Sequence, residues 1–357
     1  MAPGLPLVGM DAVRARFLAR NLDPSVVDVI LQARKQVTWV TYLRYWDKFV
    51  AFCAERSIDP WTADIGQILS HVESQRSTLG WHFSTIKVCV SAIATFRGSL
   101  SVGITAFTHE LMAQYLAGAR RISEDARVLP DTTWEVSVVF RALQGDPFEP
   151  MEVADIKYVS AKLAILLALC SAARGCELTA LTVKGLTFSG DLKVTVFPDP
   201  SFRPKTVGAI VRRRPLVLRA FHPSPRTAAQ RRLHLLCPVR ALRIYLQRVT
   251  ETRLSDRLLL TYGGRTPGSA LSTQRLAHWL VDGITMCYAL QGMTAPRLRA
   301  HSTRGVSTSV AVLSGTDWDT VRETASWSSD VSFLRHYFVH QRVPGVAEAV
   351  LAQADCS

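Results

Sequence analysis

The sequence predicts a mainly α-helical protein with a small antiparallel sheet, an α+β class, built as two domains. At 357 residues the chain exceeds what one ordinary hydrophobic core holds, so it is expected to divide. Its first third shows only helical spacing of apolar residues, whereas the remainder mixes helical patterns with short strand-like runs. Hydrophobic residues make up 48% of the chain, which supplies two cores and argues against disorder.

Residues 1–127 are predicted to form a small domain of four or five short helices. Apolar residues recur at helical spacing over 24–55, 64–75, 81–96 and 108–121. Asp23 followed by Pro24 indicates an N-cap and a first-turn proline, which marks a helix start. The polar stretch 122–132 contains Pro130 and is interpreted as the linker to the second domain.

Residues 128–357 form the second, α+β domain. A buried helix is expected over 153–172, followed by two strands over 192–197 and 215–220 with a long basic loop between them. Helical patterns resume at 238–248, 273–290, 304–314 and 319–325, and a C-terminal helix is expected over 343–354. Strands gathered between helices favour helices packed around one small antiparallel sheet.

The charge of the chain favours a nucleic-acid partner. The net charge is +13, and residues up to Arg127 hold 14 basic against 11 acidic side chains, compared with 28 against 18 in the remainder. Such an excess favours a polyanion, and no concentrated basic amphipathic helix points to a membrane instead. The longest apolar run, 163–173, is too short to span a bilayer, and the start lacks a secretory pattern. Seven scattered cysteines without zinc spacing indicate reduced thiols in an intracellular protein.

Two basic clusters have the chemistry that cleavage of a phosphodiester requires. Such cleavage without a metal needs an oxygen nucleophile, cationic donors for the non-bridging oxygens and a proton source for the leaving oxygen. Arg174 follows the buried helix, and Glu177 lies one helical turn later, where it can orient the guanidinium. His301 and Arg304 share one face of a helix start and can address one anion. Taken singly, the first pair is also a common helix-end ion pair, and the second pattern is frequent in proteins.

The loop between the two strands offers a proton donor and further phosphate contacts. Lys205 lies on this hairpin loop, while Lys184 and Lys193 compete with it for the proton-donor role. The loop arginines contact DNA phosphates or form a solvated face; they are Arg203, Arg212, Arg213 and Arg214.

Two aromatic residues complete the set. Taken alone, Trp327 and Tyr337 would be core aromatics. A tyrosine has an ordinary pKa of about 10, so it needs neighbouring arginines to stabilise its phenolate before it attacks a phosphate.

The order Arg, Lys, His-x-x-Arg, Trp, Tyr resembles the tyrosine recombinases, also called the phage-integrase family. Arg174 lies 31 residues before Lys205, and Trp327 lies ten before Tyr337, as in that family. The segments AHSTRGV (300–306) and ASWSS (325–329) look most like recombinases of DIRS and Ngaro-type retrotransposons. The segments CPVRAL (237–242) and PDPSF (198–202) point the same way.

The resemblance implies roles for these residues and covers essentially the whole chain. It implies a helical core-binding domain over 1–127 and a catalytic domain over 128–357. Tyr337 would be the nucleophile and leave a 3′-phosphotyrosine. Arg174 and Arg304 would hold the phosphate, His301 would be a base or proton relay, Trp327 would add a hydrogen bond and Lys205 would protonate the leaving oxygen. Glu177 would support Arg174.

The resemblance also implies partners, assembly and location. Double-stranded DNA is the expected partner, no cofactor or metal is expected, and four protomers would assemble on two duplexes from monomers or dimers. The helix over 343–354 would dock on a neighbour or on its own domain. A eukaryotic mobile element would place the protein in the nucleus; otherwise it is expected inside the cell. Two alternatives stay open: an inactive DNA-binding module of the same fold, and a strand-relaxing enzyme like a type IB topoisomerase.

Overall fold

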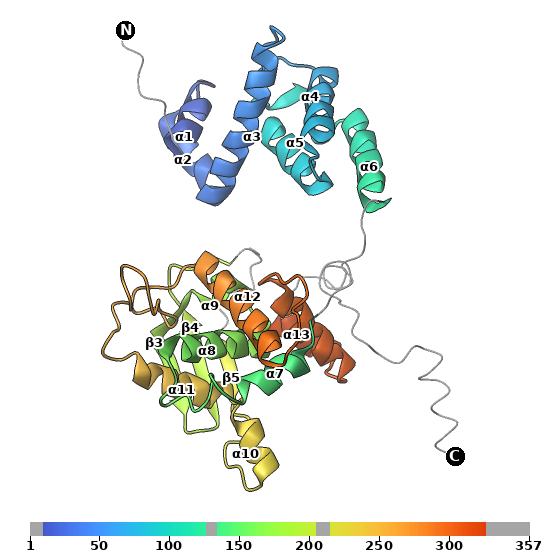
Figure 1. The fold of residues 1–357 in the computed structure, drawn as a ribbon. Helices are drawn as coiled ribbons and strands as arrows, with labels where there is room; N and C mark the ends of the chain where they lie inside the picture. Colours follow the sequence, from blue (N-terminus) through green and yellow to red (C-terminus); the bar gives the residue numbers. More distant parts are fainter. Residues whose placement is uncertain (1–9, 126–133, 205–214, 326–357) are drawn as a thin grey trace. The chain divides into compact units, whose positions relative to one another are not determined.

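The computed structural model describes residues 10–125, 134–204 and 215–325 (Figure 1). The chain divides into two compact units, Met1–Pro130 and Asp131–Ser357. Each unit has its own hydrophobic core. The predicted boundary after Arg127 and the predicted helix over 343–354 lie outside the described residues.

Over residues 10–125 the first unit is helical apart from one short hairpin. Its helices are α1 (Met10–Leu18), α2 (Pro24–Gln32), α3 (Gln36–Ala54), α4 (Ile65–Leu79), α5 (Phe83–Arg97) and α6 (Glu110–Asp125). The strands β1 (Ser99–Ser101) and β2 (Ile104–Thr105) pair antiparallel between α5 and α6. The core gathers large aromatic side chains, among them Trp39, Trp46, Phe49 and Phe96.

The predicted helix over 24–55 is two helices. Asp23 caps α2 by accepting a hydrogen bond from the Ser25 backbone N–H at 2.7 Å, which confirms the predicted start at Pro24. The helix ends at Gln32, and α3 begins four residues later. The Arg34 guanidinium between them lies over the rings of Trp39 and Tyr42, so the short connection is covered by a cation–π contact.

A histidine is enclosed in the aromatic core of this unit. His71 is fully buried, and its ring lies 5.2 Å from that of Phe49 and 4.9 Å from that of Phe52. Its Nε2 is 3.9 Å from the Cys89 Sγ. Burial lowers the pKa of His71 from 6.5 to about 4, because the charged form loses its hydration. The folded unit therefore holds this histidine neutral at pH 7.

The second unit packs its helices around α8 (Ile156–Ser171). The other helices are α7 (Val136–Leu143), α9 (Gly175–Leu178), α10 (Ala228–His234), α11 (Pro238–Arg248), α12 (Thr273–Leu290), α13 (Ser302–Leu313) and α14 (Trp318–Thr324). Helix α8 passes through the unit and packs against α11, α12 and α13 (Figure 1). Its predicted burial is confirmed, since eleven of its residues are buried. Within the described ranges no helix is long and apolar enough to cross a membrane.

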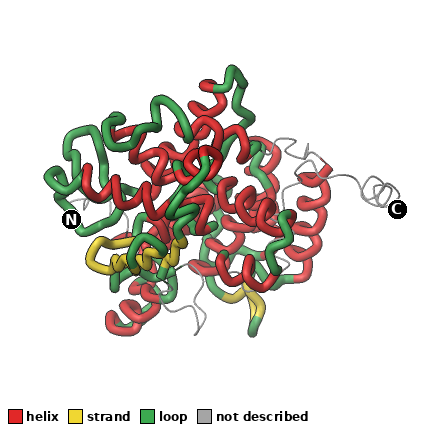
Figure 2. The backbone as a smooth tube through the Cα atoms, turned by 90° about the horizontal axis from the view of Figure 1, so that it is seen from below, coloured by secondary structure: helices red, strands yellow, loops and turns green. Residues whose placement is uncertain are grey.

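One three-stranded antiparallel sheet flanks α8. The strands β3 (Leu181–Ser189), β4 (Lys193–Pro198) and β5 (Leu216–Arg219) lie in chain order. The strands β4 and β5 were predicted, and β3 was not. Its pairing with β4 is irregular between Leu181 and Leu186, so the alternation that marks a strand is broken. Gly185 lies in this irregular part, where an added Cβ would come within 2.8 Å of the Phe197 Cβ. Figure 2 shows helices dominating beside small strand regions, which confirms the predicted fold class.

A buried ionic cluster joins the α7–α8 connection to α11. The Lys162 side chain is 0% exposed, and its Nζ donates to the Leu143 carbonyl at 2.6 Å and to Glu149. Arg240 donates to both oxygens of Glu149, at 2.8 and 3.1 Å, and to Glu152 at 3.2 Å. One carboxylate, Glu149, therefore pairs with two cations below the surface.

Candidate active site

The site begins where α8 ends. Ala172 caps the helix in the left-handed conformation, with φ 49° and ψ 21°. That conformation costs an alanine about 1–2 kcal/mol. The Ser171 Oγ accepts a hydrogen bond from the Ala173 backbone N–H at 3.2 Å, which braces the turn. The chain therefore leaves the helix abruptly, two residues before Arg174.

Arg174 is held by Glu177 through two hydrogen bonds. Arg174 is the N-cap residue of α9, and its Nη1 lies 2.9 Å from the Glu177 Oε1. The other carboxylate oxygen accepts the Arg174 backbone N–H at 2.7 Å. The arginine side chain is 18% exposed, so the guanidinium is oriented yet accessible to a ligand. The predicted ion pair is present; its part in a reaction stays a prediction.

Arg304 lies inside the unit and joins three elements. The residue is 1% exposed. Its Nη1 donates to the Ala172 carbonyl at 2.8 Å, and its Nη2 donates to the Ala325 carbonyl. These bonds fix the guanidinium between the end of α8 and the end of α14. Backbone carbonyls at helix ends lack partners within their own helix, and the planar fork of an arginine supplies two donors at once.

His301 differs from Arg304 in exposure. It is the exposed N-cap residue of α13, whereas Arg304 lies in the buried first turn. The spacing of three residues predicted that the two side chains share a face toward one anion. In the structure Arg304 makes contacts to two backbone carbonyls that the sequence pattern did not indicate; the shared face toward one anion stays a prediction.

A small apolar cluster fixes α14 at this junction. Val321 and Ala325 are buried together with Ala172, and Val312 and Trp318 pack against them. The ends of α8 and α14 and the helix α13 thus meet around the Arg304 guanidinium.

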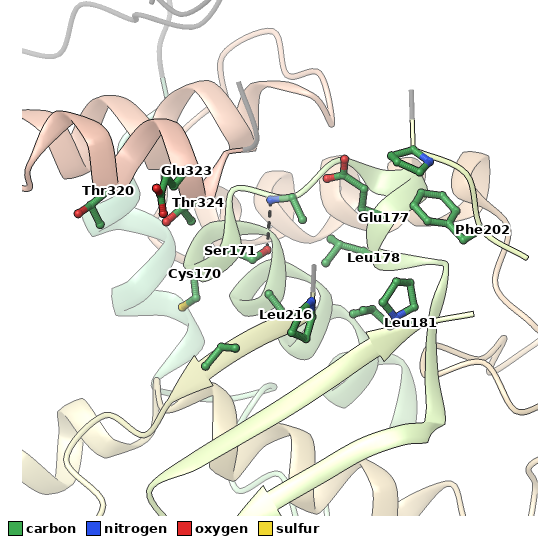
Figure 3. A pocket seen from close by; sticks show the side chains of 15 residues that line it. Cys170, Ser171, Glu177, Leu178, Leu181, Phe202, Leu216, Thr320, Glu323 and Thr324 are labelled. Carbon is green, nitrogen blue, oxygen red and sulfur yellow. Dashed lines mark hydrogen bonds between the residues drawn. The ribbon is translucent and has the colours of Figure 1, made fainter. Parts of the chain in front are cut away.

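A pocket of about 330 Å³ opens beside Ala173 and Glu177 (Figure 3). Helix α14 forms one side of it through Thr320, Glu323 and Thr324. The sheet forms the opposite side through Leu181, Pro198, Leu216 and Val217, and the remaining lining residues are Cys170, Ser171, Leu178, Phe202, Pro204 and Pro215. Pro204 and Pro215, the described residues on either side of 205–214, both line the pocket.

Comparison with known proteins identifies the architecture. No protein-family model and no curated protein matches the chain. Solved structures do match. The XerH site-specific recombinase, in a post-cleavage complex bound to palindromic difH substrate, superposes with a TM-score of 0.53 at 16% identity. The match covers 93% of this chain and 82% of the other. The chain has the tyrosine-recombinase fold.

Two further matches superpose less closely. A lambda integrase dimer bound to a COC′ core site has a TM-score of 0.47 at 12% identity, covering 89% of this chain and 96% of the other. The Tn1549 transposon integrase in complex with circular intermediate DNA has a TM-score of 0.48 at 14% identity, covering 98% of this chain and 100% of the other.

In this tyrosine-recombinase fold, six of the residues predicted for the site lie outside the described residues: Lys205, Arg212, Arg213, Arg214, Trp327 and Tyr337. Arg203 is described and exposed, and its Nη1 donates to the Pro200 carbonyl at 3.1 Å. Lys184, which competed with Lys205, is 77% exposed and lies 2.6 Å from the Asp256 carboxylate. The described ranges contain no group of three or more His, Cys, Asp or Glu that could hold a metal ion.

The two alanines whose carbonyls accept hydrogen bonds from Arg304 were not predicted. No residue type marks such an acceptor, because every residue carries a carbonyl. The left-handed conformation of Ala172 could not be predicted either, since glycine or asparagine is the residue that usually indicates it.

Proposed function

We propose that this protein is a tyrosine recombinase of a mobile element, which cuts and rejoins DNA through a 3′-phosphotyrosine on Tyr337. One contact carries the proposal: Arg304 donates to the carbonyl of Ala172, 132 residues earlier and two residues before Arg174. Arg304 is therefore hydrogen-bonded to the turn that leads into Arg174, in a chain with the tyrosine-recombinase fold. Paired arginines suit a phosphodiester, because each guanidinium carries five N–H donors, of which Arg304 uses two on the carbonyls of Ala172 and Ala325.

The distribution of charge supports DNA as the partner. From Pro200 to Thr250 the chain has twelve arginines and lysines and no acidic residue. In the described part of this stretch the exposed side chains of Arg219, Arg226, Arg231 and Arg232 form no ion pair with a described residue. Unneutralised arginines attract the phosphate backbone and release its counterions.

The proposed reaction balances with side chains alone. The Tyr337 Oη attacks the phosphorus while the bond from phosphorus to the 5′-oxygen breaks, and His301 accepts the tyrosine proton. Arg174 and Arg304 donate to the non-bridging oxygens, with Arg174 oriented by Glu177. Lys205 gives its proton to the departing 5′-oxygen, and Trp327 adds a hydrogen bond. In the reverse step a 5′-hydroxyl gives its proton to Lys205 and attacks the phosphorus, the bond from phosphorus to the Tyr337 Oη breaks, and His301 returns its proton to the tyrosine.

The proposal extends to origin, assembly and location. The segments AHSTRGV and ASWSS favour an element of the DIRS or Ngaro type, which would act in a nucleus. Four protomers would work on two duplexes, with residues 343–354 docking on a neighbouring protomer.

A covalent trap tests the proposal. The full-length protein is incubated in EDTA with labelled, nicked duplexes carrying candidate element ends, and the products are run on a denaturing gel. We expect an adduct from the wild type and none from Tyr337→Phe. The matched control is Tyr262→Phe, because the Tyr262 ring stacks on Trp279 at 4.6 Å and keeps that packing as phenylalanine.

The results of this trap distinguish an active recombinase from a DNA-binding module. An adduct from Tyr262→Phe but not from Tyr337→Phe supports tyrosine chemistry at residue 337. If wild type and both variants bind the duplexes and none forms an adduct, the chain is a DNA-binding module and the proposed reaction is wrong.

A further inference from the structure

The first described residue of the second unit is a buried tryptophan. Trp134 is the first described residue after 126–133, and it is 1% exposed. Its indole Nε1 donates to the Ser302 Oγ at 2.9 Å. The next residue, Glu135, donates its backbone N–H to the Tyr288 hydroxyl at 2.6 Å. Two successive residues are therefore fixed, the first to α13 and the second to α12.

Ser302 occupies a position next to the candidate catalytic residues. It follows His301 directly and precedes Arg304 by two residues in the first turn of α13. Its hydroxyl accepts from Trp134 and donates to the Arg299 carbonyl at 2.6 Å. The Thr303 hydroxyl donates to the Ala300 carbonyl at 2.8 Å. Side chains thus tie the turn 299–301 to the helix that follows it.

The polar contact is specific, because packing alone does not require it. A phenylalanine at residue 134 would fill much of the same space without a donor. A buried indole N–H is costly without an acceptor, and here the acceptor is a hydroxyl from the turn that carries His301. The Ser302 hydroxyl accepts a hydrogen bond from the indole and donates one to the Arg299 carbonyl. The indole is therefore linked through this hydroxyl to the turn 299–301 and helps to set its orientation.

We infer that Trp134 and Ser302 are positioning residues, whose hydrogen bond holds the start of α13 so that His301 and Arg304 address the scissile phosphate. This inference rests on the proposed function. The pair, here called the Trp134–Ser302 clamp, touches neither DNA nor phosphate in the proposal. It acts through the backbone of residues 299–304, and a displacement of about 1 Å in catalytic groups lowers rates by up to about 100-fold.

The fold provides a matched control. Tyr288→Phe removes the neighbouring hydrogen bond to Glu135, and Tyr288 lies on α12, which carries no candidate catalytic residue. This variant removes a contact of Glu135, the neighbour of Trp134, and leaves the hydrogen bond between Trp134 and α13 in place. Ser302→Thr keeps the hydroxyl that Ser302→Ala removes, so it tests rescue.

The experiment measures two quantities on the full-length protein. The first is the rate constant of adduct formation at saturating nicked duplex, beside the dissociation constant for that duplex. The second is hydrogen exchange of peptides covering residues 299–305. We expect Trp134→Phe and Ser302→Ala each to lower the rate constant about tenfold with the dissociation constant changed less than twofold. Exchange over 299–305 rises in both. Ser302→Thr and Tyr288→Phe stay near the wild type, and the double variant Trp134→Phe, Ser302→Ala is no slower than either single one.

Three results overturn the inference. Unchanged exchange over 299–305 in Trp134→Phe shows that the clamp does not hold the turn. An equal loss of rate in Tyr288→Phe shows general loosening around Trp134 and Glu135, and additive losses in the double variant show two independent effects. If the wild type forms no adduct, the proposed function fails, while the exchange measurement still decides whether the clamp exists.

Discussion

Arg304→Lys tests whether the buried guanidinium stabilises the second unit. The substitution keeps a positive charge but replaces a planar fork by a single ammonium. Arg304 donates to the carbonyls of Ala172 and Ala325, which belong to different helix ends. A lysine ammonium is a compact donor and is expected to reach one of the two carbonyls. The other carbonyl is left buried without this donor.

The expected loss of stability follows from the number of buried carbonyls that lose their donor. A buried carbonyl that loses its partner costs about 1–3 kcal/mol, so Arg304→Lys is expected to destabilise the unit by about that amount. Arg304→Met removes both donors and is expected to cost about twice as much. With a slope of about 2–3 kcal/mol per molar urea, the lysine variant moves the midpoint by roughly 0.3–1.5 M.

The assay is urea unfolding of the full chain followed by circular dichroism. Because the two units have separate cores, the curve is fitted with two transitions, and only the transition of the second unit should move. Arg299→Lys is the control, since that side chain is exposed and is expected to change stability by less than about 0.5 kcal/mol. Equal midpoints for Arg304→Lys and Arg299→Lys would refute the reasoning, because the carbonyl contacts would then contribute nothing.

Three further predictions concern other parts of the molecule. Ala172→Gly should leave stability nearly unchanged, because relief of about 1–2 kcal/mol of backbone strain is offset by the loss of a buried methyl worth about 0.8 kcal/mol and by the greater backbone entropy of glycine, which costs about 0.5–1 kcal/mol. Thermal unfolding should show Ala172→Val clearly less stable, and equal stability of the two variants would contradict this. The unfolded chain protonates His71 near pH 6.5 and the folded chain only near pH 4, so the first unit should lose stability as the pH falls between these values. His71→Phe should flatten that slope in urea unfolding at several pH values, and an unchanged slope would show that another group causes it. Replacing Arg226, Arg231 and Arg232 together by glutamine should lower the salt dependence of duplex binding by up to about three in log–log slope, as measured by fluorescence anisotropy. An unchanged slope would show that these arginines contact no phosphates.

Much of the fold could be predicted where local signals agree. The helices over 238–248 and 273–290 have the predicted bounds, because Cys237 and Ser272 precede them as caps and apolar residues repeat within them. Helix α10 was not predicted, since it has no buried residue and therefore no apolar period. Strand β3 was missed because its pairing is irregular between Leu181 and Leu186, and the apolar spacing over 24–55 did not indicate the break between Gln32 and Gln36.

Of the geometry of the candidate site, one contact could be predicted from the sequence and another could not. The pairing of Arg174 with Glu177 follows from their spacing, because residues three apart on a helical turn are neighbours. The burial of Arg304 does not follow from sequence. Its partners are backbone carbonyls more than 20 residues away in one direction and 132 in the other, and no side chain identifies them.

The ionic cluster around Glu149 has a consequence for the order in which the chain can change over generations. Loss of Lys162 would still leave Glu149 paired with Arg240, which also contacts Glu152. Loss of Glu149 first would leave two cations, one of them with no exposed surface, beside each other without that carboxylate. A lineage drifting toward an apolar cluster is therefore expected to replace the lysine before the glutamate. Relatives that have methionine or leucine at the lysine position and keep the glutamate would be the intermediates on that path.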